Sequence, residues 1–173
     1  SWALGEVVRL YREDGEWGRA VDLLTEGATL AFERDAVRAL RHEAAAAALD
    51  HLGDPERAAA IYLALFEDDP QDAPAIARLV AIYEAERQSY PLLALRRRQV
   101  VRARSADQRI ALRRLLAELL LSLEDGERAI AELEENLAEV PRDRETLAML
   151  AAVLEKEGRR AAVRDLFAGQ AAA

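Results

Sequence analysis

The 173-residue sequence contains no cysteine. Disulfide bonds, thiolate zinc sites and cysteine nucleophiles are therefore excluded. A chain without cysteine fits a reducing compartment, and we expect a cytoplasmic location unless the parent protein carries a signal or an anchor outside these residues. The sequence has no apolar run near the ~20 residues that cross a bilayer, and no signal-peptide pattern at its start. Because it begins at Ser1 rather than at methionine, we expect it to be a fragment of a longer protein.

Glycine, proline and aromatic residues are also scarce. There are 8 glycines and 5 prolines, and aromatic side chains make up 5% of the chain. Alanine (37) and leucine (27) together exceed a third of the residues. Both have high helix propensity, whereas strands favour β-branched and aromatic residues. The composition therefore predicts an all-α protein.

Residues suited to catalysis are few and scattered. The two histidines, His42 and His51, are nine residues apart on one predicted helix. At about 100° per residue their side chains lie on opposite faces, so they cannot share a metal ion. None of the four serines has a nucleophile-elbow setting, and no glycine-rich loop could cradle a phosphate. We therefore expect no catalytic residues, no metal site and no cofactor, and interpret the chain as not an enzyme.

Four stretches of the sequence resemble one another. Each has a turn glycine near its start, then polar residues, then an alanine or valine that opens an apolar-periodic run. These stretches are "EDGEWGRAVDLL" (13–24), "HLGDPERAAAIY" (51–62), "LEDGERAIAELE" (123–134) and "KEGRRAAVRDLF" (156–167). The segment before each has apolar residues at three- and four-residue intervals, typical of a helix with one buried face. The pattern predicts repeated helix–turn–helix units.

Start and stop signals agree with these helices. Asp54-Pro55 is typical of a helix N-cap followed by proline at the first helical position. Ser105 and Gln108 have the spacing of a capping box. Pro70 and Pro141 end second helices, and the aspartates two positions later, Asp72 and Asp143, are candidate caps for the helices that follow.

The units recur with a period of about 34 residues, and such an array of helix–turn–helix units resembles the tetratricopeptide repeat (TPR) family. The residues that carry the resemblance are Tyr11, Gly15, Trp17 and Ala20, then Gly53, Ala58, Tyr62 and Pro70, then Ala129, Leu133 and Pro141, and finally Leu150, Ala151 and Gly158. The third unit is the poorest, because "ERQSYPLL" lacks the turn glycine and Pro91 is expected to open its second helix. The same spacing separates Pro70 from Pro141 and Ala58 from Ala129, which suggests a two-hairpin super-repeat.

We therefore predict a right-handed α-solenoid of about five TPR-like hairpins, forming one repeat domain over 1–173. The expected units are approximately 1–34, 35–71, 72–105, 106–142 and 143–173. Other right-handed helical-hairpin solenoids fit the same pattern. At such an array's end Leu166 and Phe167 would lie exposed, so edge-mediated self-association is a further expectation.

The resemblance implies a non-catalytic scaffold for protein–protein interaction and assembly. In such arrays the first helix of each hairpin lines a concave groove that binds a peptide or helix of a partner. The expected groove residues are Arg9, Arg12, Glu43, Ala47, Asp50, Ala81, Glu84, Arg114, Glu118, Leu121 and Glu155. The alternative is a ligand-sensing or regulatory domain of a larger signalling or transcription-control protein, and a DNA-binding domain elsewhere in the parent would favour it.

The segment 95–114, here called the basic strip, holds eight arginines and one acid in a chain of net charge −8. It is interpreted first as a solvated flank of helices, and second as a docking face for an acidic protein. The residues of this secondary basic face are Arg97, Arg98, Arg102 and Arg109. Nucleic acid is disfavoured, because the strip has no interleaved aromatics and the groove is acidic. Arginine outnumbers lysine by 23 to 1, which GC-rich coding explains, and a bacterial source is expected.

Overall fold

The structure is a computed structural model that describes residues 2–30 and 33–172. It divides into two compact units, Ser1–Gln88 and Ser89–Ala173, which are described separately. The first unit holds α1 (Trp2–Glu13), α2 (Trp17–Leu30), α3 (Arg34–Asp50), α4 (Pro55–Asp68) and α5 (Ala73–Ala85). The second unit holds α6 (Ser89–Val101), α7 (Ala106–Ser122), α8 (Gly126–Glu139), α9 (Arg144–Lys156) and α10 (Arg160–Ala172).

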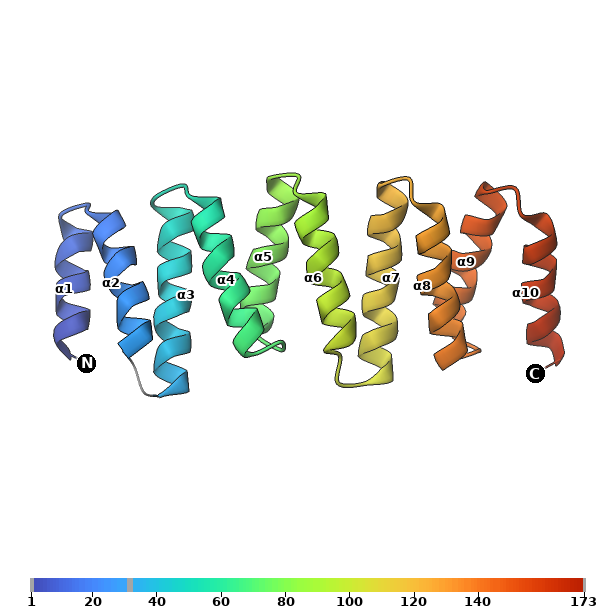
Figure 1. Cartoon of the computed structure of the whole chain (residues 1–173), viewed down its shortest axis with the longest axis horizontal. Helices are drawn as coiled ribbons and strands as arrows, with labels where there is room; N and C mark the ends of the chain where they lie inside the picture. The colour runs from blue at the N-terminus through green and yellow to red at the C-terminus, as the bar shows by residue number, and fades with distance from the viewer. Residues whose placement is uncertain (1, 31–32, 173) are drawn as a thin grey trace. The chain divides into compact units, whose positions relative to one another are not determined.

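Within each unit every helix packs against the next one along the chain. Consecutive helices run in opposite directions and are joined by short turns, so each unit is built of helical hairpins (Figure 1). The described residues form no strand. The prediction of an all-α chain of hairpins is therefore confirmed. α6 begins at Ser89, two residues earlier than expected, and Pro91 lies in its first turn, where a missing N–H breaks no helical hydrogen bond.

Aspartate caps set the starts of several helices. The Asp54 carboxylate accepts a hydrogen bond from the backbone N–H of Arg57 at 2.9 Å, and Pro55 is the first residue of α4. Asp72 and Asp143 likewise cap α5 and α9 by accepting from the N–H three residues further on. These caps are where the sequence predicted them, because the cap depends on local spacing alone.

The expected capping box of α7 is present with a one-residue shift. Ser105 Oγ accepts from the N–H of Gln108 at 3.1 Å. The Gln108 side chain turns back and accepts from the N–H of Arg104 at 2.8 Å, rather than from that of Ser105 itself. Both contacts satisfy backbone donors ahead of the first helical turn.

The turns within the hairpins share one backbone feature. After each first helix of a hairpin (α1, α3, α5, α7 and α9), the residue two positions before the next helix adopts a left-handed conformation. In three of these turns it is glycine: Gly15 (φ 74°), Gly53 (φ 61°) and Gly158 (φ 73°). The other two are Arg87 (φ 53°) and Glu124 (φ 60°). The expectation of a turn glycine in "LEDGERAIAELE" is therefore wrong, because Gly126 opens α8 while Glu124 takes the strained position.

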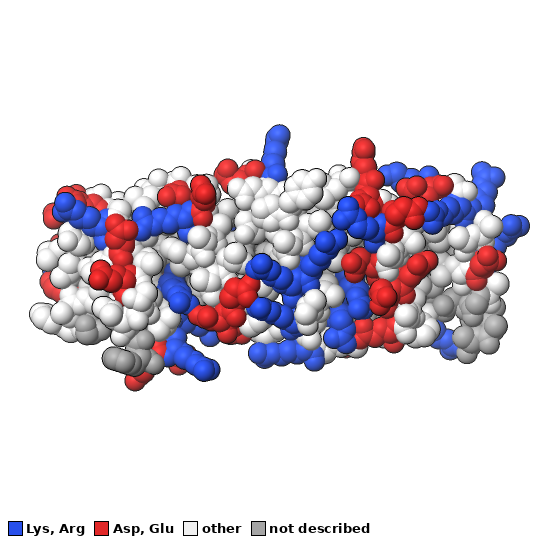
Figure 2. Space-filling view, in the orientation of Figure 1, with Lys and Arg blue, Asp and Glu red and all other residues white. Residues whose placement is uncertain are grey.

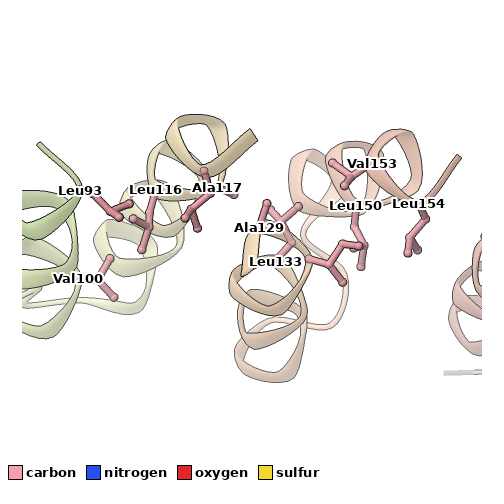
Figure 3. Close-up of a cluster of buried hydrophobic side chains, with 11 residues drawn as sticks. Leu93, Val100, Leu116, Ala117, Ala129, Leu133, Leu150, Val153 and Leu154 are labelled. Carbon is pink, nitrogen blue, oxygen red and sulfur yellow. The ribbon is translucent and has the colours of Figure 1, made fainter. Parts of the chain in front are cut away.

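A leucine-rich core holds α6 to α9 together. Leu116, Leu133 and Leu150 are at most 2% exposed, and they meet side chains from the neighbouring helices (Figure 3). The buried Ala117 and Ala129 lie in the same cluster, where their small size lets helices approach closely. In the first unit the largest fully buried side chains are Phe66, Leu24, Leu79 and Val21.

Candidate partner-binding faces

The first helices α1 and α3 border an open depression of about 370 Å³ on the first unit. It brings together three of the expected groove residues, Arg9, Arg12 and Glu43. Arg12 Nη2 lies 2.6 Å from Glu43 Oε1, so one ion pair joins the two helices across the depression. The apolar lining comes from Leu4, Val8, Leu24, Ala36, Ala39 and Leu40.

Both arginines of this depression are held by neighbours. Arg9 contacts Glu6 and Glu13 on its own helix, each at 2.5 Å, and these carboxylates raise the pKa of its guanidinium. Arg12 lies over the Trp17 ring, 5.7 Å from its centroid. A partner would therefore meet a nearly neutral surface with oriented charges, rather than free cations.

The remaining groove residues of the first unit differ in exposure. Asp50, Ala81 and Glu84 are exposed, at the end of α3 and along α5. Ala47 is only 4% exposed and lies in the core. A partner can reach the first three directly, whereas Ala47 serves close packing of α3.

A second depression of the first unit lies between α3 and α5. It is lined by Asp35, Arg38, Ala39, His42 and Pro74. Sequence reasoning did not select this place, because each of these residues is unremarkable in its own helix.

Beside that depression, Asp72 joins α3 to the start of α5. Its carboxylate is 1% exposed and lies 2.8 Å from His42 Nε2 and 3.0 Å from Arg38 Nε, while accepting from the Ala75 N–H at 3.1 Å. Burial alone would raise the pKa of Asp72, but the Ala75 N–H, His42 and Arg38 outweigh burial and lower it. His42 thus orients a buried acid. His51 instead stacks on Trp17, with ring centroids 3.5 Å apart.

The second unit has its own depression between α7 and α9, lined by Ala111, Arg114, Leu115, Glu118, Glu145 and Met149. It brings together two expected groove residues, Arg114 and Glu118. Arg114 pairs with Asp143 at 2.7 Å and with Glu145 at 2.8 Å, so it bridges the two helices. Of the other expected residues, Leu121 is half-buried on α7 and Glu155 is exposed on α9.

The basic strip is divided between two roles. Arg109 and Arg113 on α7 both bind Glu139 at the end of α8, at 2.5 and 2.9 Å. These contacts, led by the hydrogen bond from Arg109, lower the pKa of Glu139 to about 2. Arg97 and Arg98 are exposed on α6, and Arg102 is half-buried just after it. Arg109 therefore serves an inter-helix contact, whereas Arg97 and Arg98 remain on the surface.

The arginine–acid contacts of the two units occupy related positions. In the first unit Arg41 binds Asp68 and Arg38 binds Asp72. The interval from Pro70 to Pro141 relates positions of the first unit to positions of the second. At this interval Arg41 and Asp68 correspond to Leu112 and Glu139, and Arg38 and Asp72 correspond to Arg109 and Asp143. The acids recur, but their partners differ. In the second unit Arg109 binds Glu139 and Arg114 binds Asp143, while Leu112 stands where the first unit has Arg41. The interval between the two prolines therefore relates the acids of the two units but not their arginine partners.

These lowered pKa values predict acid sensitivity. Glu139 has an ordinary value of 4.5 and a folded value of about 2, and the pKa of Asp143 is also lowered, since Thr146 and Arg114 outweigh its burial. A lowered carboxyl pKa stabilises the fold above its unfolded value, and that stability is lost as the pH falls through the folded value. We expect the unfolding temperature to fall as the pH drops from about 4.5 toward 2.

The measurement is thermal unfolding by far-ultraviolet circular dichroism at a series of pH values. The matched variant is Glu139→Gln, which removes the titrating group while keeping its size. Its unfolding temperature should change less with pH over this range than that of the wild type. Parallel curves for the two proteins would show that the Arg109–Glu139 contact does not contribute to the acid response.

Within the described residues no group of three or more His, Asp or Glu side chains is arranged to hold a metal ion. None of the described helices is long and apolar enough to cross a membrane.

The helical hairpins and their packing define a TPR-like repeat fold, as predicted. Among solved structures, TPR-like repeats of a putative kinesin light chain from Podosopora anserina match with a TM-score of 0.51 and 21% identity, covering 95% of this chain and 90% of that one. MamA of AMB-1 matches with a TM-score of 0.51 and 17% identity over 95% and 86% of the two chains. BtubC from P. vanneervenii matches with a TM-score of 0.50 and 18% identity over 94% and 75%.

These likenesses concern the fold. No protein-family model matches the chain, and no curated protein matches it by sequence.

Proposed function

We propose that this chain is a non-catalytic protein-binding module that holds a peptide or helix of a partner protein on the faces formed by its first helices. The observation that carries the proposal is the presence of open depressions between successive first helices, α1 with α3 and α7 with α9. TPR-like repeats expose such surfaces, and peptide binding is their common use.

The chemistry of the two depressions suits an amphipathic segment. Each combines an apolar floor with charges of both signs, from Arg12 and Glu43 in one and from Arg114 and Glu118 in the other. Ala39 and Ala111 are exposed on the linings and leave room for a partner's side chains. An open, mixed surface favours a peptide over a small molecule, since small-molecule sites bury most of their ligand.

Site-specific photo-crosslinking tests the proposal. A photoreactive amino acid placed at Ala39 or Ala111 is expected to capture a discrete protein from a lysate of the source organism. The matched control positions are Ala60 on α4 and Ala131 on α8, which are exposed alanines on second helices. Capture of the same proteins from all four positions would contradict binding at the first-helix faces.

Charge reversal then tests the site without crosslinking. Glu118→Arg should abolish recovery of the captured protein, because it reverses a charge on the α7–α9 depression. Glu134→Arg makes the same change on the exposed side of α8 and should leave recovery unchanged. Equal recovery with both variants would exclude the second unit from the interaction.

A further inference from the structure

We propose that the outer side of α6 is a second docking surface, and that it binds an acidic protein segment that also carries aliphatic side chains. The surface, here called the α6 face, consists of Tyr90, Ala94, Arg97, Val101 and Arg104. The first four recur at intervals of four, three and four residues, so they lie in one stripe along the helix.

The apolar members of the α6 face are strongly exposed. Tyr90 is 80% and Val101 is 83% exposed, whereas Leu93, Leu95 and Val100 of the same helix are buried. The buried residues account for the packing of α6, so the exposed stripe is not needed for that packing. Eleven residues of helix place Tyr90 and Val101 about 16 Å apart, which matches about three turns of a partner helix.

The α6 face belongs to a positively charged segment of a chain that is otherwise negatively charged. Residues 89–122 carry eight arginines and two acids, a net +6, so the remaining residues carry −14 and the whole chain −8. Blue side chains gather over α6 and α7 in Figure 2, and red ones gather over α8. Charge complementarity of this kind favours an acidic occupant and speeds its association.

The positive charge on α7 is largely compensated within the unit, since Arg109, Arg113 and Arg114 bind acids of α8 and α9. Arg97 and Arg104 are instead exposed on α6 and in the turn that follows it. Burial raises the pKa of Glu132 on α8, and the nearby Arg113 and Arg97 partly offset that rise. Glu132 is half-buried, whereas Arg97 is exposed. The excess charge therefore concentrates beside the exposed Val101.

Protein fits this surface better than nucleic acid does. Single-stranded nucleic acids bind where several aromatic rings offer stacking platforms along a basic groove. The α6 face offers one ring, Tyr90, and an aliphatic contact at Val101. An acidic helix with aliphatic side chains satisfies both the arginines and the apolar ends of the stripe.

The test uses a fluorescein-labelled peptide of about 15 residues made of glutamate and leucine, followed by fluorescence anisotropy on the full chain. We expect binding that weakens as salt rises, because exposed charges are screened. The double variant Arg97→Gln/Arg104→Gln should weaken binding about tenfold, and Val101→Ser should weaken it about threefold. A peptide with glutamine in place of glutamate should bind much more weakly.

The matched control is Arg142→Gln/Arg144→Gln, which removes the same charge from exposed arginines at the start of α9. It should leave the affinity unchanged, and an equal loss would overturn the α6 face as a specific surface. Tighter binding of a single-stranded DNA of the same length would overturn the protein occupant. A dimer in sedimentation analysis that Arg97→Gln/Arg104→Gln dissolves would show that a second copy occupies the face.

This result is separable from the proposed function. The α6-face variants lie on a second helix and in the turn after it, so crosslinks from Ala39 and Ala111 should persist in them. Loss of peptide binding with retained crosslinks supports two surfaces, and retained peptide binding in the α6 variants overturns the second one alone. Far-ultraviolet circular dichroism confirms that each variant is folded.

Discussion

Leu116→Ala is expected to lower the free energy of unfolding of the second unit by about 3 kcal/mol. Leu116 is 1% exposed and lies within the cluster that α6 to α9 share (Figure 3). Truncation removes buried methyl groups and leaves a cavity that surrounding helices fill only in part. Because single domains are stable by about 5–15 kcal/mol, the loss should be visible as a large shift of the denaturant midpoint.

The neighbouring leucine provides the control. Leu115 is 40% exposed on the same helix, so Leu115→Ala has the same effect on helix propensity but opens no internal cavity. We expect its unfolding free energy to change by less than about 1 kcal/mol. Chemical denaturation followed by far-ultraviolet circular dichroism measures both. Similar losses from the two variants would mean that the cluster is not the source of the unit's stability.

This pair also illustrates what the sequence could predict. Helix positions and their buried faces follow from apolar residues at three- and four-residue intervals, and Leu116 and Leu120, four residues apart on α7, are both buried. N-caps such as Asp54 depend on residues within three positions of one another. Local patterns of this kind need no knowledge of tertiary structure.

The contacts between helices were harder to predict. Arg109 was assigned to an exposed basic face, but it binds Glu139, 30 residues away. Its partner depends on how α7 crosses the end of α8, and residue spacing within one helix does not reveal that crossing. The same holds for His42 and Asp72, which are also 30 residues apart.

The groove prediction likewise depended on positions within single helices and not on contacts between helices. Arg12 and Glu43 were placed on one surface by their helical positions, and the structure brings them within 2.6 Å of each other. Ala47 was assigned by the same rule, yet it is buried, because small residues on first helices also serve close packing. Residue size alone therefore cannot distinguish a groove floor from a helix–helix contact.

Asp72→Ala is expected to destabilise the first unit by about 3 kcal/mol, since it removes a helix cap and the buried carboxylate that three polar groups contact. The affected groups are the Ala75 N–H, His42 and Arg38. Asp143→Ala is the matched change in the second unit. Its carboxylate is 23% exposed, so water can replace part of its contacts, and a loss of about 1–2 kcal/mol is expected.

Asp72→Asn separates the cap from the charge. Asparagine keeps a side-chain oxygen that can accept from the Ala75 N–H, but it no longer carries the negative charge that faces Arg38 and His42. If the charge dominates, Asn and Ala should destabilise the first unit alike in urea denaturation. If the cap dominates, Asn should recover most of the stability. We expect the first result, because a buried carboxylate that faces the Arg38 guanidinium contributes more than one neutral hydrogen bond does.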